Sequence, residues 1–403
     1  MLKKTFTFWA LLVVAGAVLL GPASLTPAAA KYLGAEVCKK CHLKNAETWL
    51  KTKHAFAYET LEKARQQNNQ RCLICHTVGF GQEGGFTTVR ATPELKGVQC
   101  ENCHGPGGDH VIYDVTADTY LVKPGRISVG ISLEVCAKCH AGEQQFRQSA
   151  HAGSLELLRA QPDAKDYCLD CHSADRILAK ERDKPNMTLK TAQHPITCPV
   201  CHNPHDKVQV SQLRLGKQEI CVMCHTGGQI TPGVTPFHYE AQMHLGVGGV
   251  GVPPTPSVFL RAGVKCPDCH IFAREYREGR PKISGHLFLP SMDACVGCHS
   301  GPGAVPPKLN TTREATEAVK EKQKSMATLA ASLKPKIEEG GKIVTERKNL
   351  SPEALAVFNE ARLNYEFATK DPSSGFHNSE YARKLLGVSD ERITKFLNMA
   401  RGR

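Results

Sequence analysis

The chain has 403 residues, with 18 cysteines, 18 histidines and a formal net charge of +12. This length supplies a core without covalent staples, so the cysteines do not indicate a disulfide-dependent mini-protein. A hydrophobic fraction of 41% and an aromatic fraction of 6% exclude a multispanning membrane protein, and the regular cysteines exclude a disordered polycation.

The first thirty residues are typical of a secretory signal peptide. Lys3 and Lys4 precede an apolar run over residues 6–20, and the alanines at 28–30 supply a small-residue cleavage site. The run is short for a spanning helix, which needs about 20 residues; an uncleaved anchor is the alternative. We therefore expect cleavage after Ala30, export to the oxidising periplasm or to the outer surface, and no transmembrane segment in the mature chain.

Every cysteine falls into a C-x-x-C-H motif. The nine motifs are Cys38–Cys41–His42, Cys72–Cys75–His76, Cys100–Cys103–His104, Cys136–Cys139–His140, Cys168–Cys171–His172, Cys198–Cys201–His202, Cys221–Cys224–His225, Cys266–Cys269–His270 and Cys295–Cys298–His299. This spacing is typical of c-type haem attachment, because two such thiols reach the two vinyl groups of one porphyrin and the histidine binds the iron as proximal ligand. Zinc sites, disulfides and redox C-x-x-C motifs are the alternatives, and none requires a histidine after every second cysteine.

Successive motifs begin 23 to 45 residues apart. Such short stretches cannot build a separate domain around each of nine porphyrins, so the haems must pack against one another and supply apolar core. We expect a mostly α-helical fold with irregular loops, in which a haem-packed core carries a C-terminal helical bundle.

Nine further histidines remain after the proximal set. They are His54, His110, His151, His194, His205, His238, His244, His286 and His377. Their number equals the number of expected haems, which favours a second histidine on every iron. An iron with both axial positions filled transfers electrons but offers no site to a substrate. The alternative is that one position is open, or is taken by Met223, Met243 or Met292.

Three regions follow the signal peptide in chain order. Residues 31–130 carry three haem motifs, with Trp49 and His54 expected on one helix. Residues 131–302 carry six. Within them the Gly- and Pro-rich segment 226–256 is expected to be a long loop, with a ligand-access loop as the functional alternative.

Residues 303–403 contain no cysteine and are expected to form helices. A capping box at Thr311 opens one helix, which Pro335 and the glycines at 340–341 should end. Ser351 and Pro352 form the start of the next. Two more short helices are expected over residues 378–386 and 389–399.

Several stretches resemble known multihaem cytochromes. The segment 32–57, with the motif of Cys38 followed by Trp49 and His54-Ala-Phe-Ala57, resembles the opening of the tetrahaem cytochrome c-554 family. The run 97–110, Ser149-Ala-His151-Ala and Cys201-His202-Asn-Pro-His205 are similar to other distal-histidine contexts of that superfamily. The segment 375–382, Gly-Phe-His377-Asn-Ser-Glu-Tyr-Ala, resembles the C-terminal helices of pentahaem nitrite reductases and octahaem cytochromes.

The resemblance implies that His54, His110, His151, His205 and His377 are distal haem ligands. One departure concerns function: no C-x-x-C-Lys motif exists here, so the lysine-ligated catalytic haem of ammonia-forming nitrite reductases has no counterpart. The nine motifs also exceed the usual haem counts of these families. Shared ancestry does not carry a reaction over.

The sequence therefore predicts an exported nonahaem cytochrome that transfers electrons in anaerobic respiration, between redox proteins such as a quinol-linked membrane donor and other cytochromes. The alternatives are an oxidoreductase with one open haem that acts on nitrite, hydroxylamine or a sulfur oxyanion, and a haem subunit of a homo-oligomer, larger respiratory complex or filament. Nucleic acid is not expected as a partner. About 18 haem propionates would offset a mature charge of +10, because Lys3 and Lys4 leave with the signal peptide.

Overall fold

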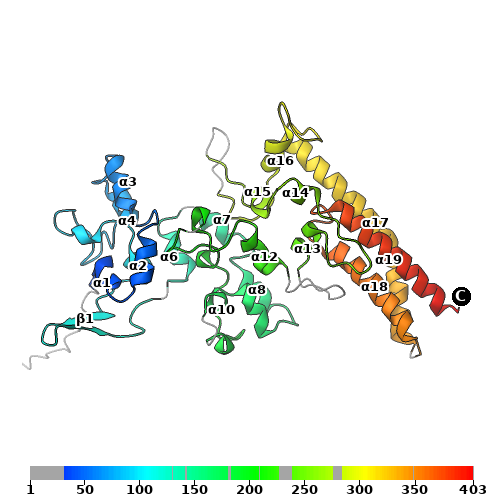
Figure 1. The fold of residues 1–403 in the computed structure, drawn as a ribbon, viewed down its shortest axis with the longest axis horizontal. Helices are drawn as coiled ribbons and strands as arrows, with labels where there is room; N and C mark the ends of the chain where they lie inside the picture. Colours follow the sequence, from blue (N-terminus) through cyan, green and yellow to red (C-terminus); the bar gives the residue numbers. More distant parts are fainter. Residues whose placement is uncertain are drawn as a thin grey trace, which may run out of the picture.

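The computed structural model describes residues 31–128, 130–140, 143–179, 183–207, 209–226, 238–275, 284–347 and 349–402. The expected signal peptide and its cleavage site lie outside these residues. Figure 1 shows an elongated arrangement, with the N-terminal elements at one end and three long helices at the other. Within the described part of the chain, no helix is both long and apolar enough to cross a membrane.

The described segments between residues 31 and 302 consist mainly of short helices and loops. The N-terminal elements are α1 (Ala35–Lys39), α2 (Leu43–Trp49), α3 (Ala57–Lys63), α4 (Gln70–His76), η1 (Pro93–Leu95), α5 (Cys100–His104), β1 (Val111–Asp114) and β2 (Thr119–Val122). The central elements are α6 (Leu133–Ala137), α7 (Glu143–Arg147), α8 (Ser154–Arg159), η2 (Asp166–Cys168), α9 (Leu169–His172), α10 (Ala174–Leu178), η3 (Lys184–Asn186), α11 (Cys198–Cys201), η4 (Val210–Gln212), α12 (Glu219–His225), α13 (Glu240–Leu245), α14 (Val258–Arg261), α15 (Cys266–His270) and α16 (Met292–His299). Strands β1 and β2 form one antiparallel hairpin. The expected fold of helices and irregular loops is confirmed.

Three long helices follow: α17 (Thr312–Glu346), α18 (Pro352–Lys370) and α19 (Ser379–Ala400). The hydroxyl of Thr311 accepts the backbone N–H of Glu314, and the hydroxyl of Ser351 accepts that of Ala354, so both predicted helix starts are confirmed. These helices hold the two largest apolar clusters, whereas the clusters of the haem-motif region are small.

Two predicted helix boundaries in this bundle are wrong. Helix α17 continues through Pro335 and both glycines to Glu346, because Gly340 lets Phe358 and Ile393 pack directly against its backbone. Packing on this face outweighs the breaking tendency of Pro335. Residues 379–400 form one helix rather than two.

The local prediction around His54 is also wrong. Helix α2 ends at Trp49 and α3 begins at Ala57, so His54 lies in the turn between them. A turn here lets the His54 backbone oxygen accept the N–H of Val98 at 3.0 Å, which ties this segment to the third motif.

The segment 226–256 is less loop-like than expected in the part that is described. It contains α13, and both Met243 of this helix and Tyr239 just before it are buried in an apolar cluster with Phe367 and Leu385 of the bundle. Residues 227–237 lie outside the described residues, so the prediction of a loop there, and of a ligand-access role, stays a prediction. The full burial of Met243 in this cluster gives its side chain a packing role.

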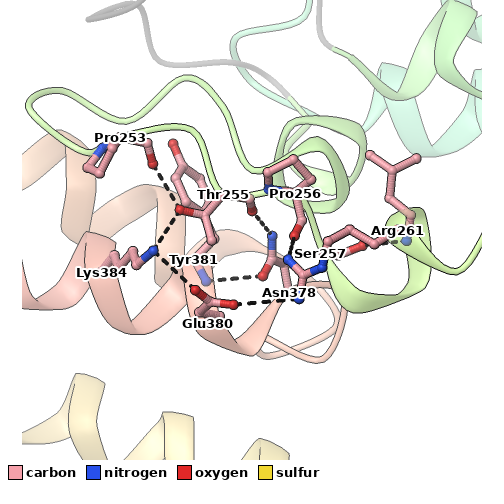
Figure 2. A network of polar contacts seen from close by, with 10 residues as sticks. Pro253, Thr255, Pro256, Ser257, Arg261, Asn378, Glu380, Tyr381 and Lys384 are labelled. Atoms are coloured by element: carbon pink, nitrogen blue, oxygen red, sulfur yellow. Dashed lines mark hydrogen bonds and ion pairs between the residues drawn. The ribbon is translucent and has the colours of Figure 1, made fainter.

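The connection after α13 is held on the bundle by polar contacts (Figure 2). Asn378 donates to the backbone oxygen of Thr255 at 2.6 Å, while its side-chain oxygen caps α19 through the N–H of Tyr381. Lys384 contacts the hydroxyl of Thr255 at 3.0 Å and the carboxylate of Glu380 at 3.1 Å. The bundle therefore fixes the path of the chain between α13 and α15, where the eighth motif begins.

Candidate functional site

The attachment motifs sit on single helical turns. In the first, fourth and sixth motifs the histidine N–H donates to the backbone oxygen of the first cysteine at 2.9–3.0 Å, as between His42 and Cys38. Positions i, i+3 and i+4 of a helix share one face. Both thiols and the imidazole of a motif therefore lie on one face, as one porphyrin requires. All eighteen cysteines lie in described segments, and none of them forms a disulfide.

Six motif histidines face a second histidine across a gap of constant width. The pairs, with their ring-centre distances, are His54–His140 (6.0 Å), His104–His205 (5.9 Å), His151–His225 (6.1 Å), His172–His238 (6.0 Å), His202–His286 (6.2 Å) and His270–His377 (6.2 Å). Each pair joins one motif histidine to one of the nine further histidines. The partners come from distant parts of the chain.

This width fits one iron between the two rings. A metal bonded to a nitrogen of each ring at about 2 Å holds the ring centres roughly 6 Å apart, because each nitrogen lies about 1 Å from its own ring centre. The six pairs therefore have the spacing of two axial ligands.

Hydrogen bonds turn the rings so that Nε2 is free to bind a metal. In one group Nδ1 contacts a backbone oxygen at 2.7–3.0 Å; its members are His76, His104, His110, His202, His270 and His299. A carbonyl oxygen can only accept, so Nδ1 carries the proton and Nε2 keeps its lone pair. This is the usual arrangement of metal-binding histidines.

In three of the further histidines, a side chain rather than a backbone oxygen is the hydrogen-bond partner of Nδ1. Nδ1 of His194 contacts Asp175 at 2.8 Å, and Nδ1 of His377 contacts Asp371 at 2.9 Å. Nδ1 of His244 contacts the hydroxyl of Ser257 at 3.1 Å, and its Nε2 is buried without a hydrogen-bond partner. Sequence reasoning missed these three acceptors, because only the folded turns bring them to their histidines.

Burial favours the neutral, metal-binding form of several further histidines. It lowers the pKa of His151 to about 4 and also lowers the pKa of His54 and His205. Loss of hydration penalises the charged imidazolium. A neutral imidazole is the form that binds a metal.

The histidines at 151, 172, 225 and 238 form one cluster. His225 also approaches His238, with ring centres 5.8 Å apart. Pairing His151 with His225 and His172 with His238 uses each ring once. Glu240 lies beside this cluster, with an oxygen 3.7 Å from Nδ1 of His225. His225, His238 and Glu240 also form a group whose donor atoms lie within 4.8 Å of one another.

The remaining motif histidines are His42, His76 and His299. Among the described residues, no ring contact with a second histidine is recorded for them. The further histidines His110, His194 and His244 are likewise without one. These predicted ligands stay predictions.

Cysteines of different motifs lie next to one another. Five pairs of thiols lie close enough for one to shift the pKa of the other: Cys38 and Cys100, Cys75 and Cys139, Cys136 and Cys198, Cys171 and Cys224, and Cys221 and Cys266. Weaker charge effects on the thiol pKa relate Cys103 to Cys139, Cys201 to Cys221 and Cys269 to Cys295, so these motifs are also neighbours. These contacts link all nine motifs into one connected series.

Two family models match parts of the chain. The family described as cytochrome c554 and c-prime matches residues 37–105, and the cytochrome c552 family matches residues 255–397. Cytochrome c-554 of Nitrosomonas europaea is 39% identical over 100 residues, covering 20% of this chain and 43% of that protein. Multiheme cytochrome MtrA of Shewanella baltica is 27% identical over 195 residues, covering 41% of this chain and 57% of MtrA. The chain thus spans about half the length of these relatives.

Two solved structures share the fold. The outer cell wall cytochrome OcwA has a TM-score of 0.63 and 22% identity, covering 90% of this chain and 99% of that one. The undecaheme cytochrome from the S-layer of Carboxydothermus ferrireducens has a TM-score of 0.60 and 18% identity, covering 92% and 70%. The attachment motifs and the matches to cytochrome families agree on the cofactor, haem c, and on the class of protein. The chain is a multihaem c-type cytochrome.

Proposed function

We propose that the chain binds nine haems c and conducts electrons along them between redox partners. The observation that carries this proposal is the set of six histidine pairs with the spacing of two axial ligands. Haem, once attached, supplies a one-electron iron couple. Ligation of each iron by two histidines leaves no position for a substrate and favours a low reduction potential.

The protein holds the axial ligands of each iron in place and sets which haems lie next to one another. Each cysteine pair holds one porphyrin covalently, and the paired histidines would bind its iron from both sides. We extend this assignment to His110, His194 and His244, whose Nδ1 atoms are held by hydrogen bonds as in metal-binding histidines.

The contacts between cysteines support transfer from motif to motif. They connect the first motif through the third and fourth to the sixth and seventh, and then through the eighth to the ninth; the second and fifth motifs branch from the fourth and seventh. The two ends of the unbranched path, the first and the ninth motif, lie at α1–α2 and at α16 (Figure 1). We propose that electrons enter and leave near these two ends.

We further propose that the protein is exported and serves anaerobic respiration. The N-terminal thirty residues have the pattern of a signal peptide, and thioether haem attachment belongs with an exported protein. N-terminal sequencing of the purified protein tests this point: a first residue of Lys31 supports export with cleavage, and an intact Met1 contradicts it.

An electron-counting experiment tests the conduction proposal. The purified holoprotein is fully reduced and mixed with an oxidised acceptor cytochrome, and haem absorbance is followed. We expect reoxidation of nine electrons per chain. In a parallel sample, nitrite or hydroxylamine should not be turned over by the reduced protein. Haems that keep their electrons, or catalytic consumption of either compound, would contradict a conducting role.

A further inference from the structure

The acceptor for Nδ1 of His377 differs in kind from those of His104, His202 and His270 in the paired set. His104, His202 and His270 donate to neutral backbone oxygens. His377 donates to the carboxylate of Asp371, whose side chain is 0% exposed. The two axial ligands expected at the eighth motif therefore have different hydrogen-bond acceptors: a backbone oxygen for His270 and a buried carboxylate for His377.

The turn between α18 and α19 holds Asp371 rigidly. One oxygen accepts Nδ1 of His377 at 2.9 Å, and the other accepts the N–H of Gly375 at 3.0 Å and the hydroxyl of Ser373. The same hydroxyl accepts the N–H of His377 at 2.9 Å. Both carboxylate oxygens are thus used, as are the backbone nitrogen and Nδ1 of His377, which fixes the direction of the ring.

A buried carboxylate in this position destabilises the fold unless a cationic or hydrogen-bonding group pairs with it. Asp371 follows the last residue of α18, where the negative end of the helix dipole disfavours an anion. Among the described residues, the one ion pair recorded for Asp371 is with His377. The nearby Lys370 turns instead to Glu366, at 3.0 Å. A buried anion in this place therefore acts mainly on His377.

A second carboxylate, that of Glu240, places negative charge near the seventh and eighth motifs. Glu240 lies 3.7 Å from Nδ1 of His225 at the seventh motif, and one of its oxygens is buried without a hydrogen-bond partner. Its charge also acts on His377 and His270. The thiol contact between Cys221 and Cys266 makes the seventh and eighth motifs direct neighbours.

We propose that Asp371 is a positioning residue that holds His377 on the iron at the eighth motif and, together with Glu240, gives this iron a lower reduction potential than a neutral acceptor would. This proposal rests on the proposed function, because it needs His270 and His377 as ligands. A fixed negative charge near an iron favours its ferric form, and a carboxylate acceptor makes the imidazole a stronger donor. Transfer of an electron onto the haem at the eighth motif would then be thermodynamically unfavourable, because its reduction potential is lowered, before the electron moves to the ninth motif.

The test compares variants of the holoprotein by redox titration and EPR. Asp371→Asn should raise the potential of one haem by at least 59 mV, a tenfold change in its reduced-to-oxidised ratio. Asp371→Glu keeps the charge and should stay close to wild type. Asp390→Asn on α19 removes the same charge from a half-exposed ion pair with Lys336 of α17, and should shift no potential.

Each outcome bears on the proposal. Conversion of one haem to high spin in Asp371→Asn, reversed by added imidazole, supports the positioning role. Unchanged potentials with all haems still low spin overturn the proposal, and so does an equal shift in Asp390→Asn. If Asp371→Asn is not produced, Glu240→Gln decides, because it removes the second carboxylate of the proposal and leaves the Asp371 turn intact: an upward shift in the potential of the haem at the eighth motif supports the proposal and no shift there overturns it. A wild-type protein without a low-spin haem at the eighth motif would instead contradict the proposed function itself.

Discussion

Gly340 of α17 lies directly against the ring of Phe358 on α18. A Cβ added at Gly340 would come within 2.8 Å of this ring and within 2.7 Å of Ile393 on α19. The three long helices therefore meet at a point where only a hydrogen fits. This contact explains why α17 passes through a glycine pair that would otherwise end it.

Substitution at this point should destabilise the bundle. Gly340→Ala gains about 0.5–1 kcal/mol of helix propensity but overpacks the contact, which costs about 1–3 kcal/mol. We expect a net loss of about 1 kcal/mol in the free energy of unfolding, measured by urea titration. Gly341→Ala is the matched control: its nearest neighbour would be 3.9 Å away, and it should stabilise the protein. Equal effects of the two variants would refute the packing argument.

Asn364 should be essential for holding the connection after α13 on the bundle. Its buried amide accepts the N–H of Val250 and donates to the oxygen of Val250, both at 2.9 Å. Asn364→Ala leaves two backbone groups without partners, at about 1–3 kcal/mol each. Thermal unfolding should show a clear loss of stability. Asn359→Ala, on an exposed position of the same helix, should change little; a harmless Asn364→Ala would mean that water replaces the amide.

Glu101 should anchor the start of the described chain. This buried carboxylate accepts the backbone N–H groups of Leu33, Gly34 and Gly107 at 2.7–3.0 Å. Glu101→Gln removes the charge that strengthens these bonds, so we expect a loss of about 1.5–3 kcal/mol. Limited proteolysis should then cut the N-terminal segment sooner. Glu36→Gln, at an exposed position, should leave the cutting rate unchanged.

His54 should supply one axial ligand at the fourth motif, because its ring faces that of His140. His54→Ala should convert one haem from low to high spin in the EPR spectrum, and imidazole should restore it. The neighbouring exposed Lys53→Ala should keep the wild-type spectrum. A His54→Ala spectrum identical to wild type would assign the ligand elsewhere.

Local patterns in the sequence predicted the features that depend on few residues. The nine motifs, the helix caps at Thr311 and Ser351 and the largely helical fold follow from short-range chemistry. The course of α17 does not, because packing of Phe358 on Gly340 overrides local helix-breaking signals. The support of His377 by Asp371 depends on the seven-residue turn over residues 371–377, whose shape is set by tertiary contacts. Histidine pairing is equally non-local, since His151 meets His225 across 74 residues.

The most direct test of the account is the number and spin state of the haems in the purified, fully oxidised protein. Mass spectrometry gives the number of attached haems, and quantitative EPR gives the coordination of each. We predict nine haems per chain, all low spin and unaffected by cyanide or nitrite. Fewer than nine haems, or a stoichiometric high-spin haem that binds either anion, would contradict it.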